Sequence, residues 1–447
     1  RAVHSRASAH PRLRRRARRE LHPRAAATSV ESAAFERLAA EAGARSLVGV
    51  APGVHGNGLV TTRAVEKHEV LLSVPVAKCL TIVEQGDSYG LKLPAGEWSR
   101  LRAGMSLAHG LPWDVHLARS LLDARAGEGG VFLQGYLAEM VPTTFSLPFC
   151  LPEELLNELQ HRDAAEGALA QRERLHLLCP DVFPPASDVE GRGTDLDEFL
   201  WAFACVRSRV FISGQGSFSY VPFLDLANHA RTPNADFRCE GIDWSASGRP
   251  AQDPANYDQF ELVALEDLEA GEEVFISYTG GPYAAKMTSQ RMLAQYGFVE
   301  SGGNAQDRLA LAEAVSKAAA EGAAQTLSLE RVQKAVGDAD FIGVVTGENP
   351  RMEAVLRSLP MRNDDDASSS ALVPSAAAEA MLAAALEAEV DARLAEFPTT
   401  PTEDAEALST ANDERLSAAI RYRLERKSIL MLAKRVLSEI QKEETEG

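Results

Sequence analysis

The sequence has few cysteines, and none are grouped at the short spacings typical of metal sites. The five cysteines stand at positions 79, 150, 179, 205 and 239, with no C-x-x-C among them. Structural zinc sites need clustered Cys or His ligands, so we predict no metal site. Scattered cysteines without a secretory hydrophobic segment also favour a reducing compartment.

Long hydrophobic runs and excess positive charge are also lacking. No apolar run reaches the roughly eighteen residues that a membrane-spanning helix needs, so we predict no membrane span. The 46 Lys and Arg are outnumbered by 64 Asp and Glu, which gives a net charge of -18. Because phosphate binding needs an excess of basic side chains, we predict no nucleic-acid partner. With 447 residues, 45% of them hydrophobic, the chain is ordinary globular material.

The first 30 residues differ from the rest. They hold nine Arg, no Lys and the single acid Glu20, so they carry 9 − 1 = +8 and the remainder carries -18 − 8 = -26. Arg-rich and acid-poor N-terminal segments are typical of organelle transit peptides. We therefore predict that residues 1–30 are a transit peptide, with a disordered basic tail as the alternative.

The spacing of apolar residues divides the remainder into β-like and helical stretches. Short β-rich pieces alternate with Gly and Pro between about 46 and 83, and residues 209–300 return to this character. From about 99 to 208, apolar residues recur three to four apart, as on a helix face. After Gly303 the chain is rich in Ala and Leu, with helical spacing up to Ile440.

These stretches predict an α+β protein. We expect a β-rich domain over 31–300 that is interrupted by a helical insert at about 85–208. An all-helical C-terminal lobe is predicted to follow over 304–447. Within this lobe, the polar stretch Asn363–Ser370 is expected to be a flexible loop.

Three short motifs hold candidate functional residues. Gly56-Asn57-Gly58 would let backbone amides approach a ligand, although taken alone it is as typical of a hairpin turn. It has neither the G-x-G-x-x-G spacing of a dinucleotide site nor the G-K-[ST] ending of a phosphate loop. The pair Asn228-His229 follows the apolar run Val221–Asp225, which we predict to be a strand ending at the polar pair. Tyr278 ends a further strand-like segment.

In this order, and followed by Tyr296-Gly-Phe298, the motifs resemble those of SET-domain protein methyltransferases. The absence of zinc-type cysteines, the helical insert and the helical C-terminal block are similar to the Rubisco large-subunit lysine methyltransferase family. This resemblance covers about residues 46–440.

The resemblance implies S-adenosylmethionine as cofactor. In the family, the backbone at the glycine motif and the Asn-His pair hold this molecule, and Arg209 pairs with its carboxylate, which suits a bidentate guanidinium. The residues assigned to the cofactor in this way are His55, Gly56, Asn57, Arg209, Asp225, Asn228, His229, Tyr296 and Phe298.

Tyr278 is the residue assigned to catalysis, because an in-line methyl transfer needs aligned dipoles near the transferring group. Ser208 and Phe211 are assigned to the substrate. An aromatic residue at 211 suits the apolar stem of lysine, whereas a histidine-methylating relative carries a polar residue there. We therefore predict a protein-lysine N-methyltransferase, with a protein-histidine methyltransferase of the same fold as the alternative.

Two other readings remain. Cys205, His229 and Asp225 could form a nucleophile triad, but Cys205 lies in an apolar helical run without an activating context. The chain could instead be a non-catalytic adaptor that binds partners through its helical lobe. The retained Asn, Tyr and glycine motifs favour activity. The family implies a chloroplast protein such as Rubisco large subunit or aldolase as substrate. We expect a monomer in the chloroplast, with cytoplasm or nucleus as alternatives.

Overall fold

The computed structural model describes residues 29–53, 56–85, 88–92, 112–183, 198–214, 217–239, 259–279, 286–362 and 374–445. The predicted transit segment up to residue 28, His55 and the predicted loop Asn363–Ser370 lie outside the described residues. Contacts divide the chain into two compact units. The first unit runs to Thr143 and resumes at Asp197–Gly280, and the second unit combines Thr144–Leu196 with Gly281–Gly447. The second unit therefore contains part of the predicted helical insert.

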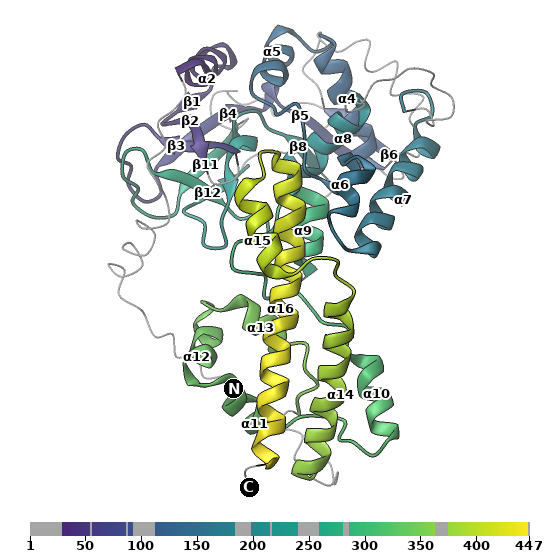
Figure 1. Cartoon of the computed structure of the whole chain (residues 1–447). Coiled ribbons are helices and arrows are strands. Elements are labelled where there is room, and N and C mark those ends of the chain that lie inside the picture. The colour runs from purple at the N-terminus through teal and green to yellow at the C-terminus, as the bar shows by residue number, and fades with distance from the viewer. Residues whose placement is uncertain are drawn as a thin grey trace. The chain divides into compact units, whose positions relative to one another are not determined.

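The described strands all fall in the first unit, where they form three four-stranded sheets with the orders β1-β4-β11-β10, β2-β3-β12-β9 and β6-β5-β8-β7 (Figure 1). Their bounds are β1 Arg45–Ser46, β2 Val48–Gly53, β3 Gly56–Thr61, β4 Val70–Pro75, β5 Leu80–Gln85, β6 Ser88–Lys92, β7 Val210–Gly214, β8 Ser217–Tyr220, β9 Asn228–His229, β10 Ala235–Arg238, β11 Gln259–Ala264 and β12 Glu273–Ile276.

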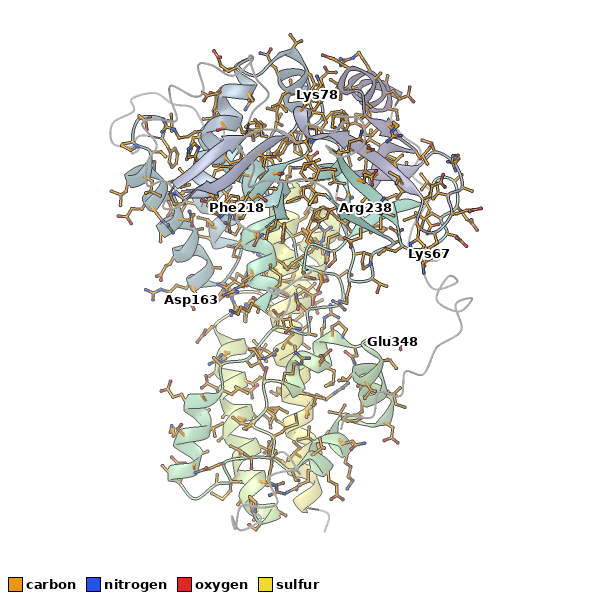
Figure 2. The ribbon with its side chains drawn as sticks, turned by 180° about the vertical axis from the view of Figure 1, so that it is seen from behind. Lys67, Lys78, Asp163, Phe218, Arg238 and Glu348 are labelled. Atoms are coloured by element: carbon orange, nitrogen blue, oxygen red, sulfur yellow. The ribbon has the colours of Figure 1, made fainter. Side chains whose placement is uncertain are left out.

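Helices cover these sheets within the first unit: α2 Ser29–Ala42, α4 Trp113–Arg125, α5 Val131–Glu139 and α8 Glu198–Arg209. Apolar residues repeat along each helix, and the resulting faces are buried, as Leu117 and Leu121 of α4 show. Trp113 of α4 stacks on Phe218 of β8 with ring centroids 4.0 Å apart, and Figure 2 labels Phe218. This stacking fixes the start of α4 on the third sheet.

The second sheet joins the segments that carry the sequence motifs. Strand β12 pairs antiparallel with β3, where Glu273 lies opposite Val60. It pairs parallel with β9, where Phe275 lies opposite Asn228 and Ile276 opposite His229. The glycine motif, the Asn-His pair and the strand that leads to Tyr278 are therefore neighbours in one sheet.

The prediction that Val221–Asp225 is a strand is wrong. Strand β8 ends at Tyr220, and Leu224–Leu226 forms a single turn of 3₁₀ helix. Pro222 has no amide N–H to donate to a strand neighbour, and Phe223 has a positive φ of 69°, which lies outside the region that strand residues with side chains adopt. Apolar character in this run reflects burial and not strand pairing.

Within the second unit the described elements are helical: η2 Pro148–Cys150, α6 Glu153–Asn157, α7 Arg162–Leu178, α9 Ser289–Tyr296, α10 Ala312–Ala320, α11 Leu329–Val336, α12 Asp338–Thr346, α13 Pro350–Leu356, α14 Ala376–Ala395, α15 Pro401–Thr410 and α16 Glu414–Thr445. Helix α16 runs beside α14, and α13 and α11 also pack on it (Figure 1). Leu327, Leu382, Leu386 and Val436 are fully buried in this helical core.

A buried ionic cluster joins the two stretches of chain that form the second unit. The carboxylate of Asp404 is fully buried and accepts hydrogen bonds from Arg423 Nε, at 2.8 Å, and from Lys427 Nζ. Arg423 also donates to the side chain of Glu158, and Lys427 donates to Gln160 Oε1 at 3.2 Å. Because each buried charge has opposite charges or polar partners, the cluster is compatible with burial.

Candidate functional site

Asn228 is held by a carboxylate on the neighbouring strand. Its Nδ2 donates to Glu273 Oε1 at 2.9 Å, and the residue is 7% exposed. Gly58 lies against this pair: a Cβ at position 58 would come within 2.5 Å of Glu273 Oε1 and 2.6 Å of Asn228 Nδ2. A side chain at position 58 would therefore displace the Asn228–Glu273 pair.

The other end of the glycine motif is a turn, as the hairpin interpretation predicts. Gly53 pairs with Gly56 across two intervening residues, and Gly56 has a φ of 87°. A Cβ at Gly56 would meet nothing within 4 Å, so the backbone is open on that side. The side chain of Asn57 donates from Nδ2 to Glu31 at 3.1 Å.

Tyr278 and His229 are in direct contact. The hydroxyl of Tyr278 donates to the carbonyl oxygen of Ala227 at 2.7 Å, and its backbone N–H donates to His229 Nδ1 at 3.1 Å. The two rings lie 5.2 Å apart between centroids. Because a backbone N–H can only donate, Nδ1 of His229 must accept and carries no proton.

Asp225 is the centre of a buried polar cluster. Its side chain is fully buried, and Arg209 Nη1 lies 3.1 Å from Oδ2. Tyr220 donates to the same oxygen at 3.1 Å, and Tyr136 donates to Oδ1. Arg209 Nη1 also donates to the backbone oxygen of Asp225 at 3.0 Å. The cluster fixes both the side chain and the main chain of Asp225.

Burial sets the protonation of this cluster. Burial, and then the neighbouring Asp225, raise the pKa values of Tyr136 and Tyr220 well above their ordinary value, so both phenols stay protonated donors. Burial also raises the pKa of Asp225, which Arg209 and the hydrogen bonds oppose. Burial, the largest single effect, lowers the pKa of Arg209, but Asp225 and the other acidic groups around it together raise this pKa by more, so the guanidinium stays charged.

The backbone at Phe223 is strained. Its φ of 69° and ψ of -43° are rare for a bulky residue, and such a conformation costs about 1–3 kcal/mol. The amide of Phe223 donates to the hydroxyl oxygen of Tyr136 at 2.7 Å. Its ring makes edge contacts with Tyr136 at 4.9 Å and with Phe35 at 5.2 Å between centroids. These contacts hold the turn that leads to Asn228.

Asn234 is a residue that our sequence reasoning did not select. It is 1% exposed, its Nδ2 donates to Glu273 O at 2.8 Å, and its Oδ1 accepts from Phe275 N at 2.7 Å. It thus binds the backbone of β12 on both sides of Val274. The sequence signal that could have identified it is the Pro233-Asn234 step shortly after the Asn-His pair.

The two residues assigned to the substrate lie where α8 passes into β7. Ser208 Oγ donates to Ala204 O at 2.7 Å, a bond within the helix. Phe211 is half-buried and packs edge-on against Phe237 of β10, with ring centroids 4.8 Å apart. The aromatic wall at position 211 therefore consists of two rings.

Tyr296 and Phe298 belong to the second unit. They flank Gly297, which ends α9 in a left-handed conformation, and their rings lie 6.3 Å apart. Gln295 donates to the Tyr296 hydroxyl at 3.0 Å. Their assignment to the cofactor stays a prediction, as do those of Arg209, Asp225 and His55.

The nucleophile-triad alternative conflicts with this geometry. A triad histidine would donate from Nδ1 to the carboxylate, but Nδ1 of His229 accepts from Tyr278. The carboxylate of Asp225 accepts from Tyr136, Tyr220 and Arg209. Cys205 is fully buried in α8.

The described residues hold neither a membrane-spanning helix nor a cluster of metal ligands. No described helix has the length and apolar character needed to cross a membrane. Among the same residues, no group of three or more His, Cys, Asp or Glu has an arrangement that could hold a metal ion.

A strand-end Asn-His pair, a tyrosine just past the end of the neighbouring strand and a glycine hairpin paired with that strand point to the class of protein. Residues 56–279, half of the 447-residue chain, match the family model of the SET domain. The chain belongs to the SET-domain family. Residues 345–430 match the family model described as Rubisco LSMT substrate-binding. The predicted resemblance to the Rubisco large-subunit lysine methyltransferase type is thus confirmed.

Characterised relatives include two plant enzymes. The chain is 27% identical over 254 residues to [fructose-bisphosphate aldolase]-lysine N-methyltransferase, chloroplastic, of Arabidopsis thaliana. This match covers 55% of this chain and 46% of the relative. It is 26% identical over 254 residues to the ribulose-1,5 bisphosphate carboxylase/oxygenase large subunit N-methyltransferase, chloroplastic, of Pisum sativum, covering 56% and 47%. The chain spans about half the length of these curated relatives.

The fold is similar to that of a solved structure, the SET domain of LSMT bound to lysine and AdoHcy. The TM-score is 0.54 at 20% identity, and the match covers 94% of this chain and 93% of the other. At this identity the likeness shows the fold alone. It confirms the predicted α+β class, a SET domain with a helical C-terminal region.

Proposed function

We propose that this chain is an S-adenosylmethionine-dependent protein-lysine N-methyltransferase. The observation that carries the proposal is the hydrogen bond from Tyr278 to Ala227, next to the Asn228-His229 strand. The phenol oxygen thus lies beside the start of the Asn-His pair, which the family resemblance assigns to the cofactor. Membership of the SET-domain family and the named activities of the relatives support the same reaction.

The residues present suit S-adenosylmethionine. The hairpin backbone at Gly56 is open, and two residues further on Gly58 packs against the amide of Asn228. Because Nδ2 of Asn228 donates to Glu273, its Oδ1 is the side-chain atom that can accept from the ammonium group of the cofactor. Asn228 and the backbone of Gly56, Asn57 and His229 would hold the cofactor, which supplies an electrophilic methyl group on a sulfonium sulfur.

Tyr278 would act on the acceptor amine. Its O–H is directed to Ala227, so its oxygen lone pairs can accept a hydrogen bond from the substrate nitrogen and orient it. A lysine amine has an ordinary pKa near 10.4 and must lose a proton before it attacks. Burial favours that loss, and the half-buried pair Phe211 and Phe237 would surround the apolar lysine stem.

The substrate proposed is a chloroplast protein such as Rubisco large subunit or aldolase, because the relatives are named for these substrates and for the chloroplast. To test this, the purified chain is incubated with labelled S-adenosylmethionine and each of the two proteins, or a stromal extract. Mass spectrometry then identifies the modified residue. Label on a lysine is expected, and label on a histidine would favour the alternative acceptor. A wild-type chain that binds S-adenosylmethionine but labels nothing would favour the adaptor.

The location is tested separately. A fluorescent protein fused behind residues 1–28 is expected to enter plastids, since this segment holds all nine N-terminal arginines. A cytosolic or nuclear signal would contradict the proposed chloroplast location and reopen other substrates.

A further inference from the structure

Tyr136 links the predicted helical insert to the motif that carries the site. It lies on α5, is fully buried, and its hydroxyl makes two hydrogen bonds to one short segment. It donates to Asp225 Oδ1 and accepts from the amide of Phe223 at 2.7 Å. A single phenol oxygen therefore connects the first and last residues of the Phe223–Asp225 turn.

This turn has a conformation that needs outside support. Phe223 has a positive φ, which L-residues with bulky side chains avoid. Beyond it, the 3₁₀ turn is closed by Leu226 N donating to Phe223 O at 3.2 Å and by Ala227 N donating to Leu224 O at 3.1 Å. The position of Ala227 therefore depends on Phe223 through consecutive hydrogen bonds.

The carbonyl of Ala227 is the acceptor of the Tyr278 hydroxyl, at 2.7 Å. We propose that Tyr136 is a positioning residue: by holding the strained turn at Phe223, it sets the Ala227 carbonyl that orients Tyr278. The inference rests on the proposed function, in which Tyr278 acts on the acceptor amine. It assigns a role to α5, which lies outside every motif found in the sequence.

Tyr220 provides a matched comparison. It is also fully buried and also donates to Asp225, at Oδ2 over 3.1 Å. The amide of Phe223 bonds to Tyr136 and not to Tyr220. Tyr136→Phe and Tyr220→Phe therefore each delete one buried phenol oxygen on Asp225, but only the first removes the acceptor of the Phe223 amide.

The first test measures hydrogen exchange by mass spectrometry on the intact chain, in the peptide that contains Phe223. In Y136F the Phe223 amide loses its acceptor, so its exchange is expected to speed up by about fivefold to tenfold. In Y220F the exchange is expected to stay at the wild-type rate. Equal exchange in the two variants would overturn the proposal.

The second test is kinetic. Y136F is expected to lower kcat by at least about tenfold while KM for a lysine peptide changes little, because the loss affects alignment and not binding. The loss of kcat in Y220F is expected to be several-fold smaller than the loss in Y136F. The double variant Y136F/Y278F should have the same kcat as Y278F alone. Tyr136 acts by orienting the Tyr278 phenol oxygen, and Y278F has already removed that oxygen. Fully additive losses, or faster exchange with unchanged kcat, would refute the positioning role.

Failure of the proposed function and failure of Y136F to fold can both be distinguished from failure of the positioning role. If the wild-type chain transfers no methyl group, the proposed function fails, and the exchange comparison alone decides whether Tyr136 holds the turn. If Y136F does not fold, 3,5-difluorotyrosine is placed at position 136, because fluorine weakens the hydroxyl as an acceptor and leaves the ring in place. Exchange at Phe223 and kcat are then expected to shift in the same directions, and unchanged values would refute the proposal.

Discussion

The amide of Asn228 faces Glu273 on the neighbouring strand, with Nδ2 donating to Oε1 at 2.9 Å. Because a carboxylate cannot donate, this bond fixes which side of the amide is the nitrogen. The oxygen of Asn228 is thereby oriented for a ligand that carries a donor, such as an ammonium group. Glu273, absent from our sequence predictions, is the residue that sets this orientation.

Replacing Gly58 with Ala should disturb this pair. The added Cβ would overlap Glu273 Oε1 and Asn228 Nδ2, so the two side chains must separate. We expect S-adenosylmethionine affinity, measured by calorimetry, to fall by about tenfold, the loss expected when a buried hydrogen bond is broken. Gly167→Ala is the control, because Gly167 lies within α7 and no atom lies within 4 Å of a Cβ there. Unchanged affinity in G58A would remove the Asn228–Glu273 pair from the cofactor site.

Asn228→Ala should weaken the same affinity more directly. The variant removes the proposed acceptor of the cofactor and leaves the Glu273 carboxylate without this donor. We expect the free energy of S-adenosylmethionine binding to weaken by about 1–3 kcal/mol. Asn349→Ala serves as control, because that side chain caps α13 in the second unit and should affect stability alone. If calorimetry finds equal affinities for N228A and the wild type, Asn228 does not bind the cofactor.

Tyr278→Phe removes only the phenol oxygen. Cofactor affinity should be nearly retained, whereas turnover should fall at least about tenfold, or about 1.4 kcal/mol of barrier. Tyr422→Phe is the matched control: it deletes a buried phenol oxygen that is bonded to His161 in the second unit. Steady-state kinetics on a lysine peptide gives both values. Equal turnover in Y278F and the wild type would end the catalytic assignment.

Asp404→Ala should strongly destabilise the chain. It leaves the side chains of Lys427 and Arg423, 1% and 4% exposed, without their shared carboxylate. Breaking such a buried pair costs about 3–5 kcal/mol, which urea unfolding can measure. Glu166→Ala breaks the exposed pair with Arg162 and should change stability by less than about 0.5 kcal/mol. Similar losses in the two variants would show that burial does not strengthen the cluster.

His161 should make stability depend on pH. Burial, and then Arg426, lower its pKa from 6.5 to about 4, although Asp163 opposes the shift. The unfolded chain therefore binds a proton on this imidazole between about pH 6.5 and pH 4 while the folded chain does not. Stability contributed by neutral His161 should be complete above pH 6.5 and decline towards pH 4, because protonation places a charge on a partly buried ring. The free energy of unfolding of His161→Gln, measured by urea unfolding at each pH, should fall less between pH 6.5 and pH 4 than that of the wild type. Parallel curves for the two proteins would show that His161 does not cause the pH dependence.

The sequence was informative where short motifs are strand ends. Asn228, His229 and Tyr278 were selected from local patterns, and the sheet brings them together through the pairing of β9 with β12. Strand pairing between segments about fifty residues apart could not be predicted, but the order of the motifs made the family resemblance visible.

The supporting residues were missed because their roles depend on distant partners. Tyr136 reads as one apolar position of a helix, yet its partner Asp225 is 89 residues away. Glu273 looks like an ordinary charged residue at the start of a strand. The prediction of a strand at Val221–Asp225 was wrong because a continuous apolar run is typical of a buried strand and also of a buried turn. Only Pro222 indicated the turn.

The ionic cluster of the second unit has a consequence for synthesis on the ribosome. Gln160 accepts a hydrogen bond from Lys427, 267 residues away in the sequence, and Glu158 accepts one from Arg423, 265 residues away. Since the chain emerges from its N-terminus, the segment around residue 160 is made long before these partners exist. Glu158 and Gln160, between α6 and α7, therefore lack these partners until α16 has been translated. A chain stopped after Asn304 would lack α16 and these bonds permanently, so partner binding through the helical lobe has to be tested with full-length variants.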